Sequence, residues 1–126
     1  MRVIDTSIWI ELAVNSAVGA KARPLFPPCK RTIVPTIVQY ELSRWFSRMV
    51  GEAATEAMMA RTALCNIVAL DTHLAIAAAG VARDCKLAMA DAIIYATALT
   101  HDADLLTCDA HFEGLERVVY LPKNAR

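Results

Sequence analysis

Four carboxylates from four separate segments are the residues of this sequence best suited to do chemistry together: Asp5, Glu41, Asp91 and Asp109. Asp5 and Asp109 each end a short apolar run, and each run predicts a buried β-strand. Acidic side chains at the carboxyl ends of strands point into the crevice where open α/β sheets bind ligands. Glu41 and Asp91 lie in strongly helical stretches that could face the same crevice.

A cation is needed to bring these four carboxylates together, because like charges in one site raise each other's pKa. Oxygen ligands suit Mg²⁺ or Mn²⁺, so the sequence predicts a site for one of these ions. Such a site usually performs phosphate chemistry through a metal-activated water. The hydroxyls of Thr6 and Ser7, next to Asp5, are expected to orient its carboxylate or to hold a metal-bound water.

Short apolar runs that alternate with helical stretches predict an α/β fold, a three-layer α/β/α sandwich around a mainly parallel sheet of roughly five strands. Thr36 and Gln39 match a capping box, so Thr36 is expected to cap the helix that carries Glu41. Thr6 or Ser7 is expected to cap the first helix. The predicted strands are residues 2–5, 31–34, 66–70, 104–108 and 118–121, and the other predicted helices are residues 8–12, 18–26, 52–64, 72–83 and 89–101.

The composition favours one small domain over residues 1–126, expected in the cytoplasm. No apolar stretch approaches the ~20 residues of a membrane span, and the first apolar strand begins where a signal peptide would lie. The four cysteines are scattered, which argues against a zinc site or a disulfide framework. The 13 basic and 13 acidic residues balance, which counts modestly against an RNA substrate, although four of the acids are assigned to the metal.

The acidic motifs also resemble those of a known family. Residues 3–7, 40–42, 87–98 and 106–112 match, in order and spacing, the motifs of the PIN domain family, most closely the ribonuclease toxins of VapBC-type toxin–antitoxin pairs. The resemblance covers the whole chain. It implies a toxin of a type II toxin–antitoxin system, an endoribonuclease that hydrolyses RNA phosphodiester bonds with Mg²⁺ or Mn²⁺.

The resemblance also assigns roles to single residues. It implies that Glu41 is the helix-borne acid of the site, that Asp109 is a ligand or holds a metal-bound water, and that Thr107 is a supporting hydroxyl. Many relatives carry a further acid where this chain has His111. His111 is interpreted as a surface histidine or, alternatively, as a phosphate contact, and Asp109 could simply open a turn.

Each of the other acids has a purely structural alternative. Asp5 could cap the first helix. Glu41 could be solvated or paired with Arg44 or Arg48 instead of a metal. Asp91 lies in the first turn of a helix, where the helix dipole favours an anion.

Single-stranded or looped RNA is the expected substrate, since unstacked bases can be splayed out in an open groove. Arg44, Arg48, Arg83 and Lys86 are candidate phosphate contacts, although each could be an ordinary surface charge.

The expected protein partners are a second copy of the chain and a VapB-type antitoxin, and operator DNA is expected to bind only through the antitoxin. No membrane contact is expected. A domain this small cannot easily bury 56% apolar residues, so an exposed apolar patch is predicted. The candidates are the helices that carry residues 9–12, 45–46 and 58–59.

Two other functions fit the acids less well. A receiver or a haloacid-dehalogenase-like phosphatase needs a lysine near the last core strands, and the latter also needs D-x-D where Ser7 interrupts that pattern. A catalytically silent interaction module would not need all four acids.

Overall fold

A five-stranded sheet forms the centre of the computed structural model, which describes residues 1–123. Neighbouring strands are all parallel, in the order β3-β2-β1-β4-β5. β1 therefore lies between β2 and β4, and Ile4 pairs with Leu106 across the β1–β4 boundary. The strands are β1 (Arg2–Ile4), β2 (Thr32–Pro35), β3 (Asn66–Val68), β4 (Asp104–Thr107) and β5 (Val118–Tyr120).

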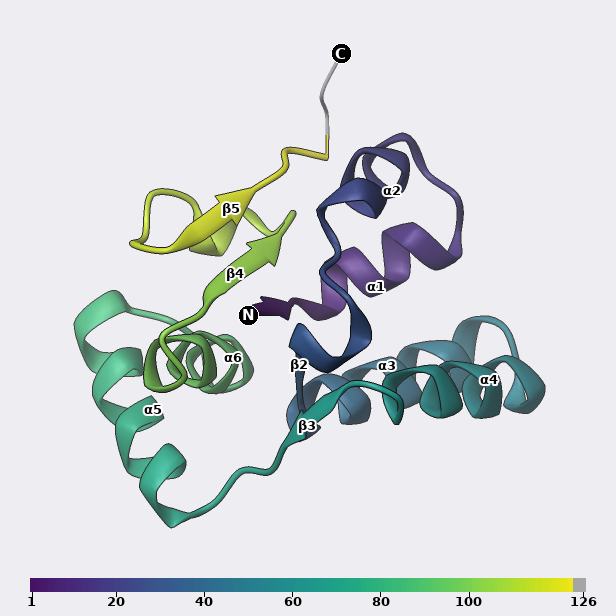
Figure 1. Ribbon diagram of the computed structural model, residues 1–126. Coiled ribbons are helices and arrows are strands. Elements are labelled where there is room, and N and C mark those ends of the chain that lie inside the picture. The colour runs from purple at the N-terminus through teal and green to yellow at the C-terminus, as the bar shows by residue number, and fades with distance from the viewer. Residues whose placement is uncertain (124–126) are drawn as a thin grey trace.

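Helices cover both faces of the sheet. Connections between parallel strands are right-handed, so helices change face when the chain reverses its direction across the sheet. The chain crosses from β1 to β2 and β3 in one direction, with α1–α4 on one face, and returns to β4 through α5 and α6 on the other (Figure 1). The predicted three-layer α/β/α sandwich is confirmed. The helices are α1 (Thr6–Ala13), α2 (Ala17–Ala22), α3 (Thr36–Met49), α4 (Glu52–Thr62), α5 (Thr72–Cys85) and α6 (Met89–Thr100), with 3₁₀ turns at Arg23–Leu25, Cys29–Arg31 and Ala110–Phe112.

The central strands carry uninterrupted apolar runs because helices cover them on both faces. Ile4 of β1, and Leu105 and Leu106 of β4, are fully buried. α6 is buried through seven consecutive residues, Ala92 to Ala98, and packs along α5. Asp91 directly precedes this buried stretch, so the packing of α6 fixes its position.

Two predicted helix caps are wrong, because each helix begins at or before the residue that was expected to cap it. α3 begins at Thr36 itself, with Pro35 of β2 in the cap position. The Thr36 hydroxyl accepts a hydrogen bond from the backbone N–H of Leu70 instead. α1 likewise begins at Thr6, and Asp5 occupies the cap position without a capping hydrogen bond from its side chain. The hydroxyls near Asp5 are therefore free for other partners.

The predicted helix over residues 18–26 is also wrong in part. α2 ends at Ala22, and Arg23–Leu25 form a 3₁₀ turn. Pro24 lies within this turn, and its ring has no N–H and clashes with the carbonyl four residues earlier in an α-helix. All other predicted element ends lie within two residues of the observed ones.

The predicted apolar patch is supported only in part, because Ile10, Trp45 and Met59 are partly buried while the other apolar candidates are buried. Trp9, Leu12, Phe46 and Met58 lie in the core, each less than 9% exposed. The large apolar side chains that are exposed belong to other positions: Met1, Val14, Tyr40, Met49, Val50, Leu64, Ile67, Leu70, Ile76, Met89 and Leu99. They are scattered over several elements, because α1, α3 and α4 use their apolar faces to pack on the sheet. Among the described helices, none combines the length and apolar character needed to cross a bilayer.

Candidate active site

The acids that follow β1 and β4 meet at the point where the strand order reverses. Connections lead away from β1 toward β2 in one direction, while β4 lies on its other side. The Asp5 N–H donates a 2.9 Å hydrogen bond to the carbonyl of Leu106, so Asp5 continues the ladder with β4. Asp109 lies three residues beyond Leu106. Crevices at such switch points are where open α/β sheets bind ligands.

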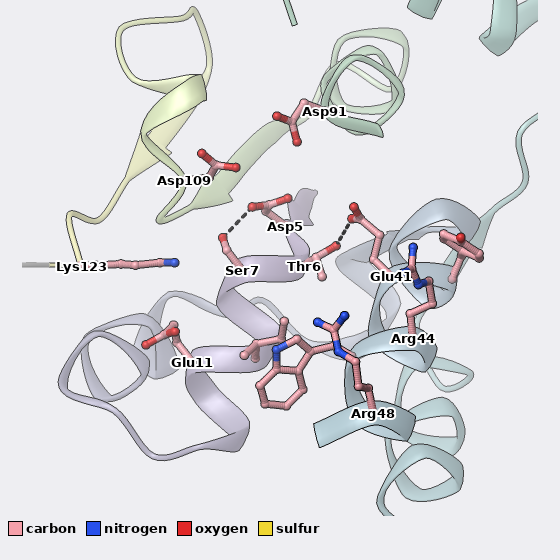
Figure 2. A pocket seen from close by; sticks show the side chains of 13 residues that line it. Asp5, Thr6, Ser7, Glu11, Glu41, Arg44, Arg48, Asp91, Asp109 and Lys123 are labelled. Carbon is pink, nitrogen blue, oxygen red and sulfur yellow. Dashed lines mark hydrogen bonds between the residues drawn. The ribbon is translucent and has the colours of Figure 1, made fainter. Parts of the chain in front are cut away.

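Glu41 and Asp91 reach the same place from helices on opposite faces of the sheet. Glu41 lies in the second turn of α3, directly after β2, and Asp91 lies in the first turn of α6. Together with Asp5 and Asp109 they line one cavity of about 570 Å³. Figure 2 shows the four carboxylates turned toward this shared space. The structure thus brings together all four acids selected from the sequence.

Asp5 is the most buried of the four, at 3% exposed. The hydroxyls of Ser7 and Thr107 both donate to its Oδ2 atom, at 2.6 and 2.8 Å. The pKa of Asp5 is raised to about 6, chiefly by burial and also by the nearby carboxylates of Asp91 and Asp109, while the two hydrogen bonds lower it. Holding this carboxylate ionised therefore costs free energy in the protein alone.

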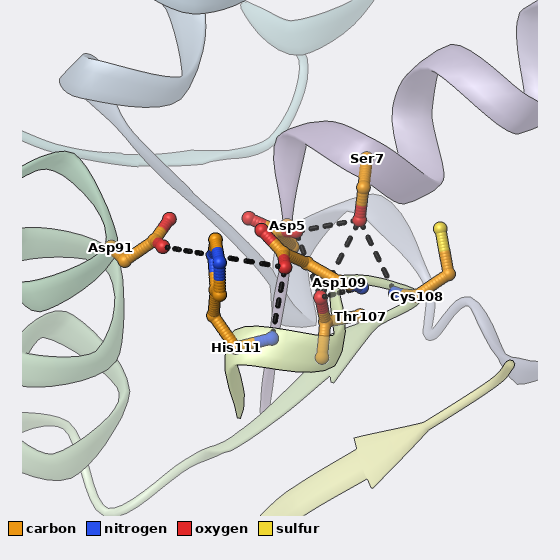
Figure 3. A network of polar contacts seen from close by, with 7 residues as sticks. All are labelled: Asp5, Ser7, Asp91, Thr107, Cys108, Asp109 and His111. Carbon is orange, nitrogen blue, oxygen red and sulfur yellow. Dashed lines mark hydrogen bonds and ion pairs between the residues drawn. The ribbon is translucent and has the colours of Figure 1, made fainter. Parts of the chain in front are cut away.

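The same two hydroxyls also bind the backbone that follows β4. Ser7 Oγ accepts from the N–H of Cys108 at 3.2 Å, and Thr107 Oγ1 accepts from the N–H of Asp109 at 3.0 Å (Figure 3). Each hydroxyl therefore joins Asp5 to the segment that carries Asp109. These contacts explain why the Ser7 hydroxyl does not serve as a helix cap.

Glu41 is half-buried and has a hydroxyl partner of its own. Thr6 Oγ1 donates to Glu41 Oε1 at 2.6 Å. Burial raises the pKa of Glu41, the Thr6 hydrogen bond opposes this, and the charges of Asp91 and Asp109 add to the rise. Within the part of the chain that the structure describes, no ion pair joins Glu41 to Arg44 or Arg48. The alternative in which an arginine neutralises Glu41 is therefore not observed.

Asp91 and Asp109 are organised by a histidine. The Nδ1 atom of His111 lies 3.3 Å from Asp91 Oδ2 and 3.2 Å from Asp109 Oδ1 (Figure 3). Burial raises the pKa of Asp91, Asp109 raises it further, and His111 lowers it. His111 lies at the surface, as expected, with its side chain 75% exposed, but its ring also lies between two carboxylates of the site.

Positive charge lines the cavity from two sides. Arg44 and Arg48 line it from α3, and Lys123 lines it from beyond β5 (Figure 2). Arg83 and Lys86 are not among the lining residues: Arg83 pairs with Asp84 at 3.1 Å and Lys86 is the C-cap of α5. Lys123 was not predicted from the sequence. It lies shortly after the end of β5, as Asp5 and Asp109 lie shortly after the ends of β1 and β4.

The donor set fits a hard divalent cation. The four carboxylates supply only oxygen ligands. Burial is the main cause of the raised pKa values of Asp5, Glu41 and Asp91. Buried carboxylates are stabilised by a cation or by hydrogen bonds. Asp91, Asp109 and His111 each place one ligand atom within 4.8 Å of the other two, close enough to hold one ion.

The chain belongs to the PIN domain family, whose sequence model matches residues 2–118. A search of curated protein sequences finds no match. The family assignment agrees with the resemblance found in the motifs and leaves the receiver and phosphatase alternatives without support.

Solved structures share the fold over nearly their whole length. A toxin–antitoxin complex from Klebsiella pneumoniae has a TM-score of 0.82 at 24% identity, covering 94% of this chain and 96% of that one. VapC20 from Mycobacterium tuberculosis, described as a toxin that cleaves the sarcin-ricin loop, has a TM-score of 0.79 at 19% identity, with 97% and 99% covered. DNA-bound VapBC from Salmonella typhimurium has a TM-score of 0.73 at 14% identity, with 97% of each chain covered. At these identities the likeness establishes the fold.

Proposed function

We propose that this protein is a Mg²⁺- or Mn²⁺-dependent endoribonuclease, the toxin of a VapBC-type type II toxin–antitoxin pair, with one nuclease domain over residues 1–126. The observation that carries the proposal is the convergence of Asp5, Glu41, Asp91 and Asp109 in one cavity of a PIN-family fold. Similar folds that are described as toxins, including one that cleaves an RNA loop, support it.

The residues of the site have separable roles in this proposal. When a divalent ion is bound by the four carboxylates, it supplies Lewis acidity and lowers the pKa of water. Ser7 and Thr107 hold one oxygen of Asp5 and leave the other for the cavity, and Thr6 does the same for Glu41.

Asp91 and Asp109 are the candidates to accept a proton from the attacking water, because both carboxylates line the cavity and a positioned carboxylate can act as a general base.

RNA would approach from the side of α3. Arg44 and Arg48 lie one turn apart on this helix, a spacing that suits successive phosphates. Lys123 lies across the cavity from them. The exposed ring of Tyr40, which also lines the cavity, is available to stack on an unpaired base. Contacts from Arg83 and Lys86 remain a prediction, and their position outside the cavity lining weakens it.

The proposed partners are a VapB-type antitoxin and a second copy of the chain, with operator DNA bound only through the antitoxin, in the cytoplasm. Complexes of toxin with antitoxin, some of them bound to DNA, are among the similar structures. The balanced charge of this chain agrees with a DNA-binding element carried by the partner. A short neighbouring reading frame that encodes a DNA-binding protein would be the simplest supporting observation.

Purified protein tests the proposal directly. Single-stranded RNA should be cleaved with Mg²⁺ or Mn²⁺, cleavage should stop with excess chelator, and Ca²⁺ should support it poorly, because Ca²⁺ takes more ligands at longer distances. Expression should arrest growth, and Asp5→Asn should abolish the arrest. Asp84→Asn, which removes an exposed acid outside the cavity, is the matched control. Cleavage that persists in excess chelator, or a chain that binds neither ion and leaves RNA intact, would reject it.

A further inference from the structure

One histidine lies inside the acidic site, where the PIN resemblance leads one to expect another acid. The Nδ1 atom of His111 lies 3.2–3.3 Å from carboxylate oxygens of both Asp91 and Asp109 (Figure 3). The carboxylate of Asp5, which is 3% exposed, faces the same cavity, and only its Oδ2 atom accepts hydrogen bonds from described residues. An imidazole nitrogen therefore shares the site with carboxylate oxygens.

The backbone fixes the position of His111. Its N–H donates to Asp109 Oδ1 at 2.9 Å, and the next residue, Phe112, is fully buried. The N–H of Asp109 in turn donates to Thr107 at the end of β4. Although its side chain is 75% exposed, the histidine sits on an anchored turn that directs its ring toward the two carboxylates.

The separations suit ligands of one small cation. Neighbouring ligands of an octahedral ion with bonds of about 2.0–2.1 Å lie about 3 Å apart. The distances from His111 Nδ1 to Asp91 Oδ2 and Asp109 Oδ1, 3.3 and 3.2 Å, are close to this value. A histidine that took part would change the donor set from oxygen alone to mixed oxygen and nitrogen.

We propose that His111 is a metal ligand together with Asp91 and Asp109, and that it makes the site prefer Mn²⁺ to Mg²⁺. The inference rests on the proposed function, because it concerns the cation of the nuclease site. Mg²⁺ demands oxygen ligands and gives up its water reluctantly. First-row transition ions accept imidazole more readily, and their affinity for mixed sites rises along the series that begins with Mn²⁺.

The competing explanation is a simple ion pair, in which His111 balances the two carboxylates and leaves when an ion binds. Electron spin-echo spectroscopy of Mn²⁺ bound to the full chain separates the two, because it detects nitrogen directly bonded to the ion. The wild type should show nitrogen modulation, and His111→Gln should lose it. His73→Gln, which removes an exposed histidine that pairs with none of the four acids among the described residues, should keep it.

Isothermal titration gives a second, independent readout. His111→Asp places an acid where many relatives carry one, so it should still bind both ions. Its ratio of Mn²⁺ to Mg²⁺ affinity should fall by about tenfold or more relative to wild type, the size of effect that groups around a metal site produce. Circular dichroism should show that the exposed substitution leaves the fold intact.

The possible results separate this inference from the nuclease proposal. Mn²⁺ binding without nitrogen modulation, or an unchanged affinity ratio in His111→Asp, would overturn the role of His111 and leave the nuclease proposal standing. A wild-type chain that binds neither ion would overturn both. Nitrogen modulation that disappears in His111→Gln but not in His73→Gln, together with the reduced ratio in His111→Asp, would support the inference.

Discussion

The two sides of the acidic site are held in place by different chemistry. Asp5 is 3% exposed, and neutral hydroxyls from Ser7 and Thr107 fix one of its oxygens. The side chains of Asp91 and Asp109 are 18% and 32% exposed, and a histidine lies between them. Neutral donors fix a carboxylate without cancelling its charge, whereas a histidine can also be displaced or become a ligand. The buried side therefore sets the geometry, and the exposed side is free to adapt to ion and substrate.

The largest expected effect comes from removing the buried charge. Asp5→Asn keeps the shape of the side chain, and its amide oxygen can still accept from Ser7 and Thr107. Loss of this ligand should lower the rate of RNA cleavage on the order of a thousandfold, about 4 kcal/mol in the barrier. Initial rates with saturating Mn²⁺ would measure this, with Asp84→Asn as control. Activity within tenfold of wild type would show that the buried side does not set the geometry.

The same substitution should stabilise the protein in chelator, in a pH-dependent way. Because the pKa of Asp5 is raised to about 6 in the folded protein from an ordinary value of 3.8, ionised Asp5 costs on the order of 3 kcal/mol. This cost is absent below about pH 4, grows as the pH rises from about 4 to about 6, and is constant above that. The unfolding free energy of Asp5→Asn should therefore exceed that of wild type at pH 7.5 but not at pH 4. A constant difference between the two pH values would favour a purely structural role for Asp5.

The hydroxyl that bonds Asp5 should matter more for metal binding than the hydroxyl that bonds Glu41. Thr107→Val removes a donor to Asp5 and an acceptor for the Asp109 backbone, and should weaken Mn²⁺ binding about tenfold to a hundredfold. Thr6→Val removes only the donor to half-buried Glu41 and should cost less. Thr97→Val, a buried threonine that bonds within α6, should leave Mn²⁺ affinity unchanged. Equal losses at Thr107 and Thr6, measured by titration, would contradict the proposed division of the site.

The smallest effect is expected at the arginines. Arg44→Gln removes a cation that lines the cavity and should weaken single-stranded RNA binding severalfold, with a shallower dependence on salt. Arg83→Gln, outside the lining, should change neither. Fluorescence anisotropy over a range of salt concentrations measures both quantities. An equal effect of the two substitutions would extend the RNA path beyond the cavity, onto α5.

The strands and the acids that follow them were predicted from local pattern, whereas the role of Glu41 was implied by the resemblance to the PIN domain family. Short apolar runs before Asp5 and Asp109 specify buried strands, and parallel strands bring their carboxyl ends to one edge. The missed features depend on contacts between distant segments. Thr107 and Asp5 are 102 residues apart. The hydroxyls of Thr6 and Ser7, which were expected to cap a helix, bond Glu41 and Asp5 instead. His111 lies between two acids through the packing of a turn against α6, which no spacing along the chain reveals.

The hydrogen bond between Asp5 and Leu106 has a consequence for folding during synthesis. Asp5 is synthesised about 100 residues before the strand that supplies the acceptor for its N–H and the Thr107 donor. At about 5–20 residues per second, the delay is roughly 5–20 s. During that interval β4 has not paired with β1, so the four acids cannot yet come together. A ribonuclease built this way would be harmless as a nascent chain and become active only when its last core strands have formed.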